Sequence, residues 1–181
     1  CASTAAGPAF EGARISMGMR AATGAISKVS VAAGRLDCHV LGNVAPRGIC
    51  GSGLVDAVAA GLDLGFIEPS GRLKTGNGSL MLCPPVALTQ SDIRELQLAK
   101  GAIATGARIL LARFDAEAAE LKRLYLAGAF GNYINRASAR RIGLLSFPIE
   151  MVTPAGNTAL LGAKLALFNA SETAYAYSPL R

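Results

Sequence analysis

The sequence predicts one long helix over residues 90–114, and a helix of this length limits how the rest of a small domain can be arranged. Apolar side chains recur there every three or four residues, which is the spacing of one helical face. That face carries Ile93, Leu96, Ile103, Ala107, Leu110, Leu111 and Phe114. Thr89 precedes the helix and Asp92 follows three residues later, a variant of the capping box. At ~1.5 Å per residue the helix spans roughly 35 Å, so the remaining elements must pack along it.

Shorter strands and helices are predicted on both sides of this helix. Alternating apolar residues predict a hairpin with strands at 26–31 and 36–40, in which His39 faces away from the apolar side. Residues 76–85 are interpreted as a connection around a short apolar piece, and 124–127 as a buried strand. Further helices are predicted over 51–64, 138–142 and 156–168. The mixture predicts an α/β lobe with helices packed on a small mixed sheet.

The composition excludes several classes of function. The formal net charge is +6, but the basic residues are spread thinly and are not interleaved with aromatic residues, so nucleic-acid binding is not expected. The 4 cysteines form no CxxC pair and there is 1 histidine, so no complete metal site is expected. No apolar run approaches the ~20 residues that span a membrane, and no leader is recognised, so a cytoplasmic protein is expected.

Glycine-rich segments are the candidate ligand sites. The strand at 124–127 runs into Gly128 and Gly131, where the absence of a Cβ would let a nucleotide lie against the backbone. An ordinary tight turn explains the same glycines equally well. If a nucleotide does lie there, Gly131→Val in the full-length protein is expected to abolish nucleotide binding with little loss of folding. Residues 48–53 precede a helix whose first turn could bind phosphate, although Ser52 could also act only as an N-cap.

Two positions inside predicted helices need an explanation. Lys100 falls within the apolar stripe of the long helix, so its stem must extend to water or its charge must meet a ligand or a carboxylate. Gly162 interrupts the last helix, where glycine costs roughly 1 kcal/mol, and this predicts a close helix crossing.

Four segments together resemble the reductive activators of corrinoid proteins. They are CASTAAGPAFEG at 1–12, GICGSGLVDA at 48–57, RELQLAKGAI at 94–103 and LAGAFGNYI at 126–134. The resemblance extends to about residue 168. Each segment alone is unspecific, whereas the combination is specific to that family.

The resemblance implies a C-terminal nucleotide-binding lobe over residues 1–170, followed by a tail at 171–181. The implied fold is the actin-like ATPase (ribonuclease H-like) fold of the acetate and sugar kinase, heat-shock chaperone and actin superfamily. Such activators bind ATP or ADP with Mg and couple hydrolysis to the reduction of Co(II) corrinoid to Co(I). The chain lacks the cysteine cluster of an N-terminal 2Fe-2S domain, the Asp-Ile-Gly-Thr-Asn phosphate strand and the second lobe. The isolated chain is therefore expected to be inactive, and no catalytic residue can be named.

The same resemblance assigns the candidate site residues and partners. It assigns the adenosine loop to Gly128, Ala129, Gly131 and Asn132, and a helix beside adenine to Gln97 and Lys100. Gly7 belongs to a loop towards the phosphates, and Gly51 and Ser52 lie at the edge of the same cleft. The expected partners are the corrinoid protein of a methyltransferase system and the remaining domains of the same polypeptide, and a homodimer is a further expectation. No nucleic acid or membrane is expected.

Two other functions remain open at this point. A small-molecule kinase of the same fold, acting on a sugar or carboxylate, would need a catalytic aspartate in the cleft. The available candidates are Asp37, Asp56, Asp63 and Asp92, and none has a convincing sequence setting. The other alternative is a docking module that binds a partner without turnover.

Overall fold

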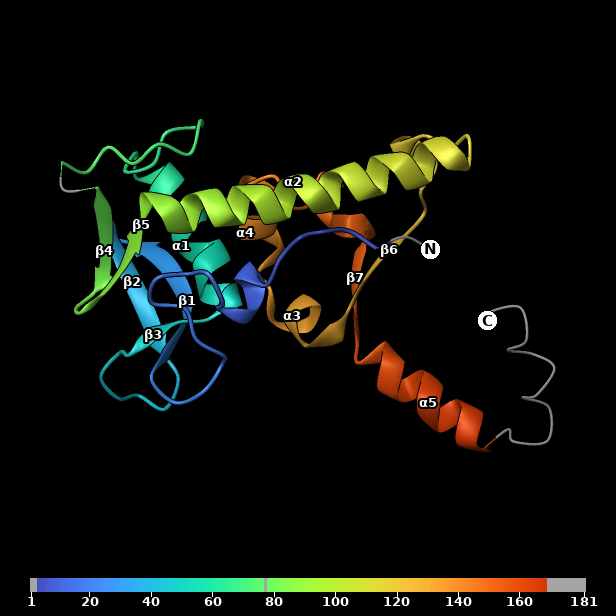
Figure 1. Cartoon of the computed structure of the whole chain (residues 1–181), viewed down its shortest axis with the longest axis horizontal. Coiled ribbons are helices and arrows are strands. Elements are labelled where there is room, and N and C mark those ends of the chain that lie inside the picture. Colours follow the sequence, from blue (N-terminus) through green and yellow to red (C-terminus); the bar gives the residue numbers. More distant parts are fainter. Residues whose placement is uncertain (1–2, 77, 169–181) are drawn as a thin grey trace.

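The computed structural model describes residues 3–76 and 78–168, and its long helix lies along one side of the other elements (Figure 1). The first two residues of the chain and the expected tail at 171–181 lie outside the described residues. The elements in chain order are η1 (Ala9–Glu11), β1 (Ala25–Ala32), β2 (Arg35–Val40), β3 (Gly48–Ile49), α1 (Gly51–Asp63), β4 (Ser79–Cys83), β5 (Val86–Thr89), α2 (Gln90–Arg113), η2 (Ala118–Glu120), β6 (Leu124–Ala127), α3 (Gly128–Tyr133), α4 (Arg136–Arg141), η3 (Ile149–Met151), β7 (Val152–Gly156) and α5 (Thr158–Phe168).

The strands form three small sheets. In the first, β1 pairs antiparallel with β2 and parallel with β3, which confirms the predicted hairpin and makes this sheet mixed. The second sheet is the antiparallel pair β4–β5. The interpretation of residues 76–85 as a connection is therefore wrong, because Ser79–Cys83 is a strand that pairs with the one after it. In the third sheet β6 pairs parallel with β7, a strand that the sequence analysis did not predict.

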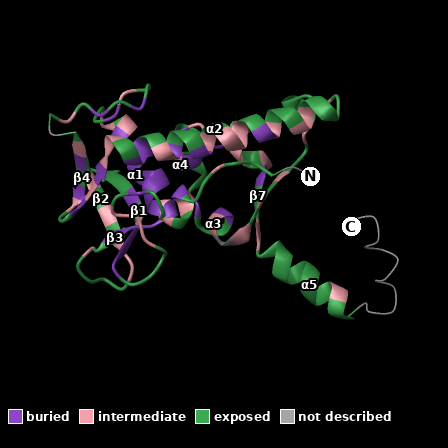
Figure 2. Ribbon diagram, in the orientation of Figure 1, coloured by how far each residue is buried: buried purple, intermediate pink, exposed green. Residues whose placement is uncertain are grey.

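The hydrophobic core surrounds α1. Almost the whole length of this helix is buried, and Figure 2 shows that buried residues gather in the half of the molecule that contains α1, β1 and β4. Small residues allow this close packing. A Cβ at Gly53 would collide with the carbonyl oxygen of Ile26 on β1, and one at Gly61 would lie 2.7 Å from a methyl group of Ile67. The abundance of alanine and glycine in α1 thus lets the helix approach both the sheet and the turn that follows it.

The other half of the molecule is thinly packed. Helix α5 extends away from the remaining elements and has no buried residue between Thr158 and Phe168 (Figures 1 and 2). The expectation of a close helix crossing at Gly162 is wrong for the described residues, because none of their atoms lies within 4 Å of a Cβ built there. Strand β6 is also less buried than predicted, since Tyr125 is 58% exposed. Phe114, predicted on the buried stripe of α2, is 78% exposed.

None of the helices that the structure describes between residues 3 and 168 is long and apolar enough to cross a membrane.

A buried carboxylate fixes the beginning of α2. Asp92 is 1% exposed and accepts hydrogen bonds from the Thr89 amide at 2.8 Å and the Thr89 hydroxyl at 2.9 Å. It also accepts from the amide and the hydroxyl of Ser16, each at 2.6 Å. The capping box predicted for Thr89 and Asp92 is confirmed. The contact with Ser16 adds a second function, because it holds the N-terminal segment against the start of the helix.

We expect Asp92→Ala to lower the free energy of unfolding by about 3 kcal/mol, because losing a cap costs ~1 kcal/mol and leaving buried donors unpaired costs ~1–3 kcal/mol. Urea denaturation measures the difference. Asp63→Ala is the matched control, since Asp63 pairs with Arg141 at 2.6 Å on the surface and such pairs contribute ~0–1 kcal/mol. Equal losses for the two variants would contradict the role given to Asp92.

Candidate functional site

The candidate adenosine loop is the point at which β6 passes into α3. Gly128, the first residue of α3, has a φ of +83°, and no described atom lies within 4 Å of a Cβ built on it. Such a φ is strained for residues with a side chain, so glycine is needed here for backbone conformation. Asn132 is exposed on the same short helix, and Ala129 lies between them, although its side chain is outside what the structure describes. The backbone at Gly128 is therefore open on the side where a side chain would otherwise lie.

Gly131 has a packing role in addition to the ligand contact expected for it. It is buried, and a Cβ built on it would lie 3.1 Å from the backbone carbon and the Cβ of Leu126. Glycine therefore allows α3 to pack closely on β6. The expectation that Gly131→Val would leave folding nearly intact is revised, because a valine would push against the backbone of the strand.

The N-terminal loop reaches this short helix through a pair of aromatic rings. Gly7, expected towards the phosphates, is exposed with a φ of +69° and open space around it. Three residues later, Phe10 of η1 stacks on Phe130 of α3, with ring centroids 4.5 Å apart and an interplanar angle of 26°. On its other side, the backbone of Phe10 touches Gly51 so closely that a Cβ on Gly51 would collide with the Phe10 carbonyl oxygen. The fold thus brings together the predicted segments at 7–12, at 51 and at 128–132.

Ser52 is not the N-cap of α1. Cys50 occupies that position and makes no side-chain capping hydrogen bond. The hydroxyl of Ser52 instead donates to the carbonyl oxygen of Ser27 on β1, at 2.9 Å. The interpretation of Ser52 as a cap is therefore wrong, and the hydroxyl fastens the first turn of α1 to the central strand.

Gln97 and Lys100 lie on α2 at a small pocket whose lining includes Glu68 and Ile142. The Lys100 ammonium group donates to the carbonyl oxygen of Ile142 at 2.8 Å, at the C-terminal end of α4. The sequence analysis expected Lys100 to extend to water or to meet a ligand or a carboxylate. Its observed partner is instead a main-chain carbonyl at a helix end, where a cation is favourable. The side-chain amide of Gln97 donates to the Ser70 carbonyl at 2.9 Å. Both side chains therefore have structural partners on segments outside α3.

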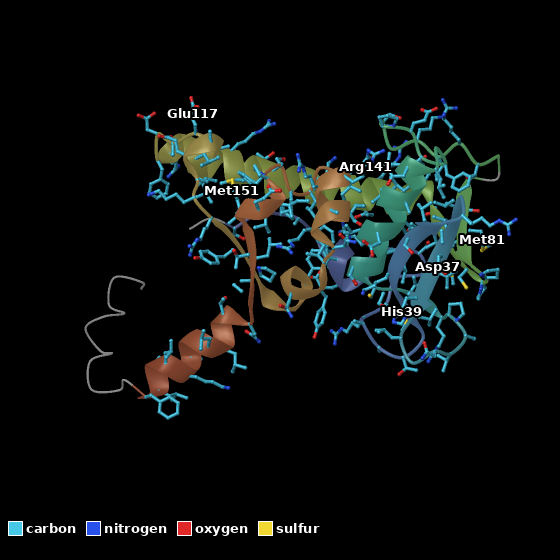
Figure 3. The ribbon with its side chains drawn as sticks, turned by 180° about the vertical axis from the view of Figure 1, so that it is seen from behind. Asp37, His39, Met81, Glu117, Arg141 and Met151 are labelled. Atoms are coloured by element: carbon cyan, nitrogen blue, oxygen red, sulfur yellow. The ribbon has the colours of Figure 1, made fainter. Side chains whose placement is uncertain are left out.

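None of the four aspartates considered for a kinase lies in the candidate adenosine loop. Asp92 is occupied by its four donors, Asp63 pairs with Arg141, and Asp37 projects from the outer strand β2 (Figure 3). Asp56 is 3% exposed in α1 and accepts from the Val29 amide at 3.3 Å. Burial raises the pKa of Asp56, while hydrogen bonds with Ser138 and Val29 and the charge of Lys28 oppose the rise. These settings give no support to a catalytic aspartate at the glycine loop.

Metal-ligating side chains do not gather within residues 3–76 and 78–168, where no three His, Cys, Asp or Glu residues could hold one ion. Cys38 lies on β2, and burial, followed by the neighbouring Cys83 and Asp37, raises the pKa of its thiol to about 11. That thiol is therefore protonated at neutral pH.

Comparison with known proteins identifies the family. Residues 1–178 match the family described as the C-terminal domain of RACo, the ASKHA domain. The chain belongs to this family. It is 37% identical to the corrinoid activation enzyme RamQ of Eubacterium limosum, over 94% of this chain and 33% of that protein. It is 32% identical to the [Co(II) methylated amine-specific corrinoid protein] reductase of Methanosarcina barkeri, over 90% of this chain and 34% of that protein.

A solved structure confirms the fold. The reductive activator for corrinoid, iron-sulfur protein superposes with a TM-score of 0.81 at 35% identity, covering 93% of this chain and 30% of that one. The actin-like ATPase fold inferred from the sequence is thereby confirmed, and membership of the family implies a nucleotide-binding domain. The chain spans about a third of the length of the relatives that it matches.

Sequence analysis missed two contacts of this region. The aromatic pair of Phe10 and Phe130 joins residues far apart in the chain, and the hydrogen bonds between Ser16 and Asp92 span 76 positions. Neither residue type is unusual at its position, so the single sequence carries no pattern that would pair them.

We expect Gly128→Ala to lower nucleotide affinity by about tenfold, equivalent to ~1.4 kcal/mol, because its methyl group would enter the open space and shift the loop. The positive φ would also cost about 1–2 kcal/mol of stability. Titration calorimetry with ADP and urea denaturation measure the two effects.

Gly34→Ala is the matched control for this variant. Gly34 has a φ of +73° and open space around it in the turn between β1 and β2, so the same strain arises away from α3. A similar loss of affinity in both variants would contradict the assignment of Gly128 to the nucleotide site.

Proposed function

We propose that this chain is the ATP-binding lobe of an ATP-dependent reductive activator, which returns the Co(II) corrinoid protein of a methyltransferase system to Co(I) in the cytoplasm. The observation that carries the proposal is the similarity, over nine-tenths of the chain, to an enzyme that is named for reducing a Co(II) corrinoid protein. The open, left-handed glycine at the end of β6 supports it, since this is where a nucleotide could lie against backbone.

In this proposal the adenosine lies beside Gly128 and Asn132, and the phosphates extend towards the loop that contains Gly7. Gly51 and Ser52 hold the first turn of α1 beneath that loop, through the contacts with Phe10 and Ser27. Gln97 and Lys100 lie at the border of the adenine side and fix the neighbouring segments there through Ser70 and Ile142. Mg²⁺ would accompany the phosphates and neutralise part of their charge.

The lobe is proposed to work with the remaining domains of a longer polypeptide. Helix α5 has one charged residue, Lys164, and its other side chains are mostly apolar. Its exposed large apolar side chains are Leu160, Leu161, Leu165, Leu167 and Phe168. The parallel pair β6–β7 supports the same idea, because parallel sheets are normally buried on both faces. The relatives are about three times as long as this chain, so they contain enough additional polypeptide to cover these surfaces. A homodimer would be another way to cover these surfaces, and a measured mass of twice 18.5 kDa would indicate it.

Coupling between nucleotide and partner follows from thermodynamic linkage. Reduction of Co(II) is unfavourable with ordinary electron donors, so ATP can drive it only if nucleotide state and corrinoid state share a conformational equilibrium. The reduced 2Fe-2S cluster expected in an N-terminal domain would supply the one electron that cobalt takes up, and this lobe would supply the nucleotide-dependent change. Whatever ATP does to the affinity for the partner, the partner must do to the affinity for ATP.

We expect the 181-residue chain to bind ADP weakly and to leave ATP unhydrolysed, because the phosphate strand and the opposing lobe are not among its segments. Titration calorimetry measures binding, and a phosphate-release assay measures turnover. Robust turnover by this chain would contradict the idea of an incomplete site.

We expect a chimera to restore activation. In it, this chain replaces the matching third of the Methanosarcina barkeri relative. Co(I) formation, followed by absorbance with the corrinoid protein of that relative, should depend on ATP, and Co(II) corrinoid protein should change the affinity for ATP. The same chimera with Gly128→Ala is the control and should form Co(I) more slowly at limiting ATP.

A folded chimera that binds no partner would contradict the proposal. Ready phosphorylation of a sugar or a carboxylic acid, without mutual effects between nucleotide and corrinoid protein, would favour the kinase alternative. Partner binding without nucleotide binding would favour the docking module.

A further inference from the structure

Phe10 forms a direct side-chain contact between two segments that are far apart in the sequence. Its ring lies 4.5 Å from that of Phe130, centroid to centroid, and both side chains are partly buried against the core. Phe10 belongs to the N-terminal loop, whereas Phe130 lies between Gly128 and Gly131 in the candidate adenosine loop. The stack is therefore a direct contact between the segments proposed to face opposite ends of a nucleotide.

The loop that carries Phe10 is firmly held. Pro8 accepts from the amides of Glu11 and Ala13, at 3.2 and 3.1 Å, and so closes the turn around Phe10. The Phe10 backbone presses on Gly51, where any side chain would collide with it. Further along, the amide and hydroxyl of Ser16 are bound to the buried Asp92. The ring of Phe10 thus projects from a backbone that is fixed to both α1 and α2.

Helix α3 lacks comparable internal support. It has six residues and begins with a glycine in a left-handed conformation. Helices this short are unstable alone, so the position of α3 depends on tertiary contacts. Gly131 packs it on β6, a strand with an exposed tyrosine and a single described partner strand, β7. The Phe10 ring adds a side-chain contact from the N-terminal loop to those that α3 makes with α1 and through the buried Ile134.

We propose that Phe10 is a positioning residue, which holds the loop at 128–132 in its nucleotide-binding position and couples it to the N-terminal loop. The inference rests on the proposed nucleotide site. Phe10 need not touch the adenosine itself, since it acts through Phe130. A shift of the N-terminal loop when the phosphates change would then move the adenosine loop as well.

We expect Phe10→Leu to lower the affinity for adenosine by about two- to tenfold, because an aromatic pair contributes the equivalent free energy beyond its buried area. Adenosine is the probe because it lacks phosphates and therefore does not report on the loop that contains Gly7. Phe10→Tyr keeps the ring and should restore the affinity. In the double variant Phe10→Leu, Phe130→Leu, the loss should be smaller than the product of the two single losses.

Phe114→Leu is the matched control. Phe114 follows the C-terminal end of α2, 78% exposed and roughly 20 Å along that helix from Lys100. This variant also replaces an aromatic ring by leucine, and it should leave adenosine affinity unchanged. All affinities are compared at a temperature where every variant is folded.

Hydrogen exchange tests the same idea without any nucleotide. The Ile134 amide donates to the Phe130 carbonyl at 3.0 Å, and the Leu64 amide donates to the Ala60 carbonyl at 2.9 Å at the end of α1. Phe10→Leu should accelerate exchange at Ile134 by about two- to tenfold while Leu64 keeps its rate. Equal acceleration at both amides would reveal only a general loss of stability and would overturn the positioning role.

The outcomes separate the two proposals. If the wild-type chain binds no adenosine, the nucleotide site fails and the role of Phe10 in it fails too, even if exchange at Ile134 responds. If the wild type binds adenosine and Phe10→Leu binds it equally well, only the role of Phe10 is overturned.

Discussion

The carboxylate of Asp92 ties the start of the longest helix to a segment that lies 76 residues earlier in the chain. With Ser16 held there, the preceding turn rests on the first residue of α1 and directs Phe10 towards α3. One buried side chain thus links α2 to the segment whose preceding turn contacts α1 and the candidate adenosine loop. A buried carboxylate is stable in this place because each of its bonds comes from a well-aligned donor, two on Ser16 and two on Thr89.

Local sequence patterns predicted the elements whose causes are local. The capping box of α2 and the β1–β2 hairpin depend on neighbouring residues, and both are confirmed. The β4–β5 pair was missed because each strand is short and two prolines, Pro84 and Pro85, lie between them, so the segment resembled a connection. Strand β6 was predicted to be buried from its apolar residues, yet what would cover Tyr125 is not among the described residues.

The candidate site illustrates the same limit. Glycine spacing and the resemblance to a family pointed to Gly128 and Gly131. Only the folded backbone shows that Gly128 has a left-handed conformation, whereas Gly131 allows close packing. The sequence identified Lys100 as unusual within an apolar stripe. Its partner, the carbonyl of Ile142, lies at the end of another helix, so the periodicity of α2 could not predict the contact. Composition shows which side chains are apolar enough to be buried, whereas the surface that covers them and the identity of a distant partner require the fold.

The uneven distribution of buried residues has a consequence for cooperativity. The half around α1 has a continuous core, whereas β6, β7 and α5 share little of it. Two-state unfolding requires that every part lose its structure together, and that condition is not met where one part contributes few of the apolar contacts. A single denaturation midpoint of this chain therefore describes the half around α1. The unfolding equilibrium of β6, β7 and α5 is separate, and it depends on the surface that packs against α5.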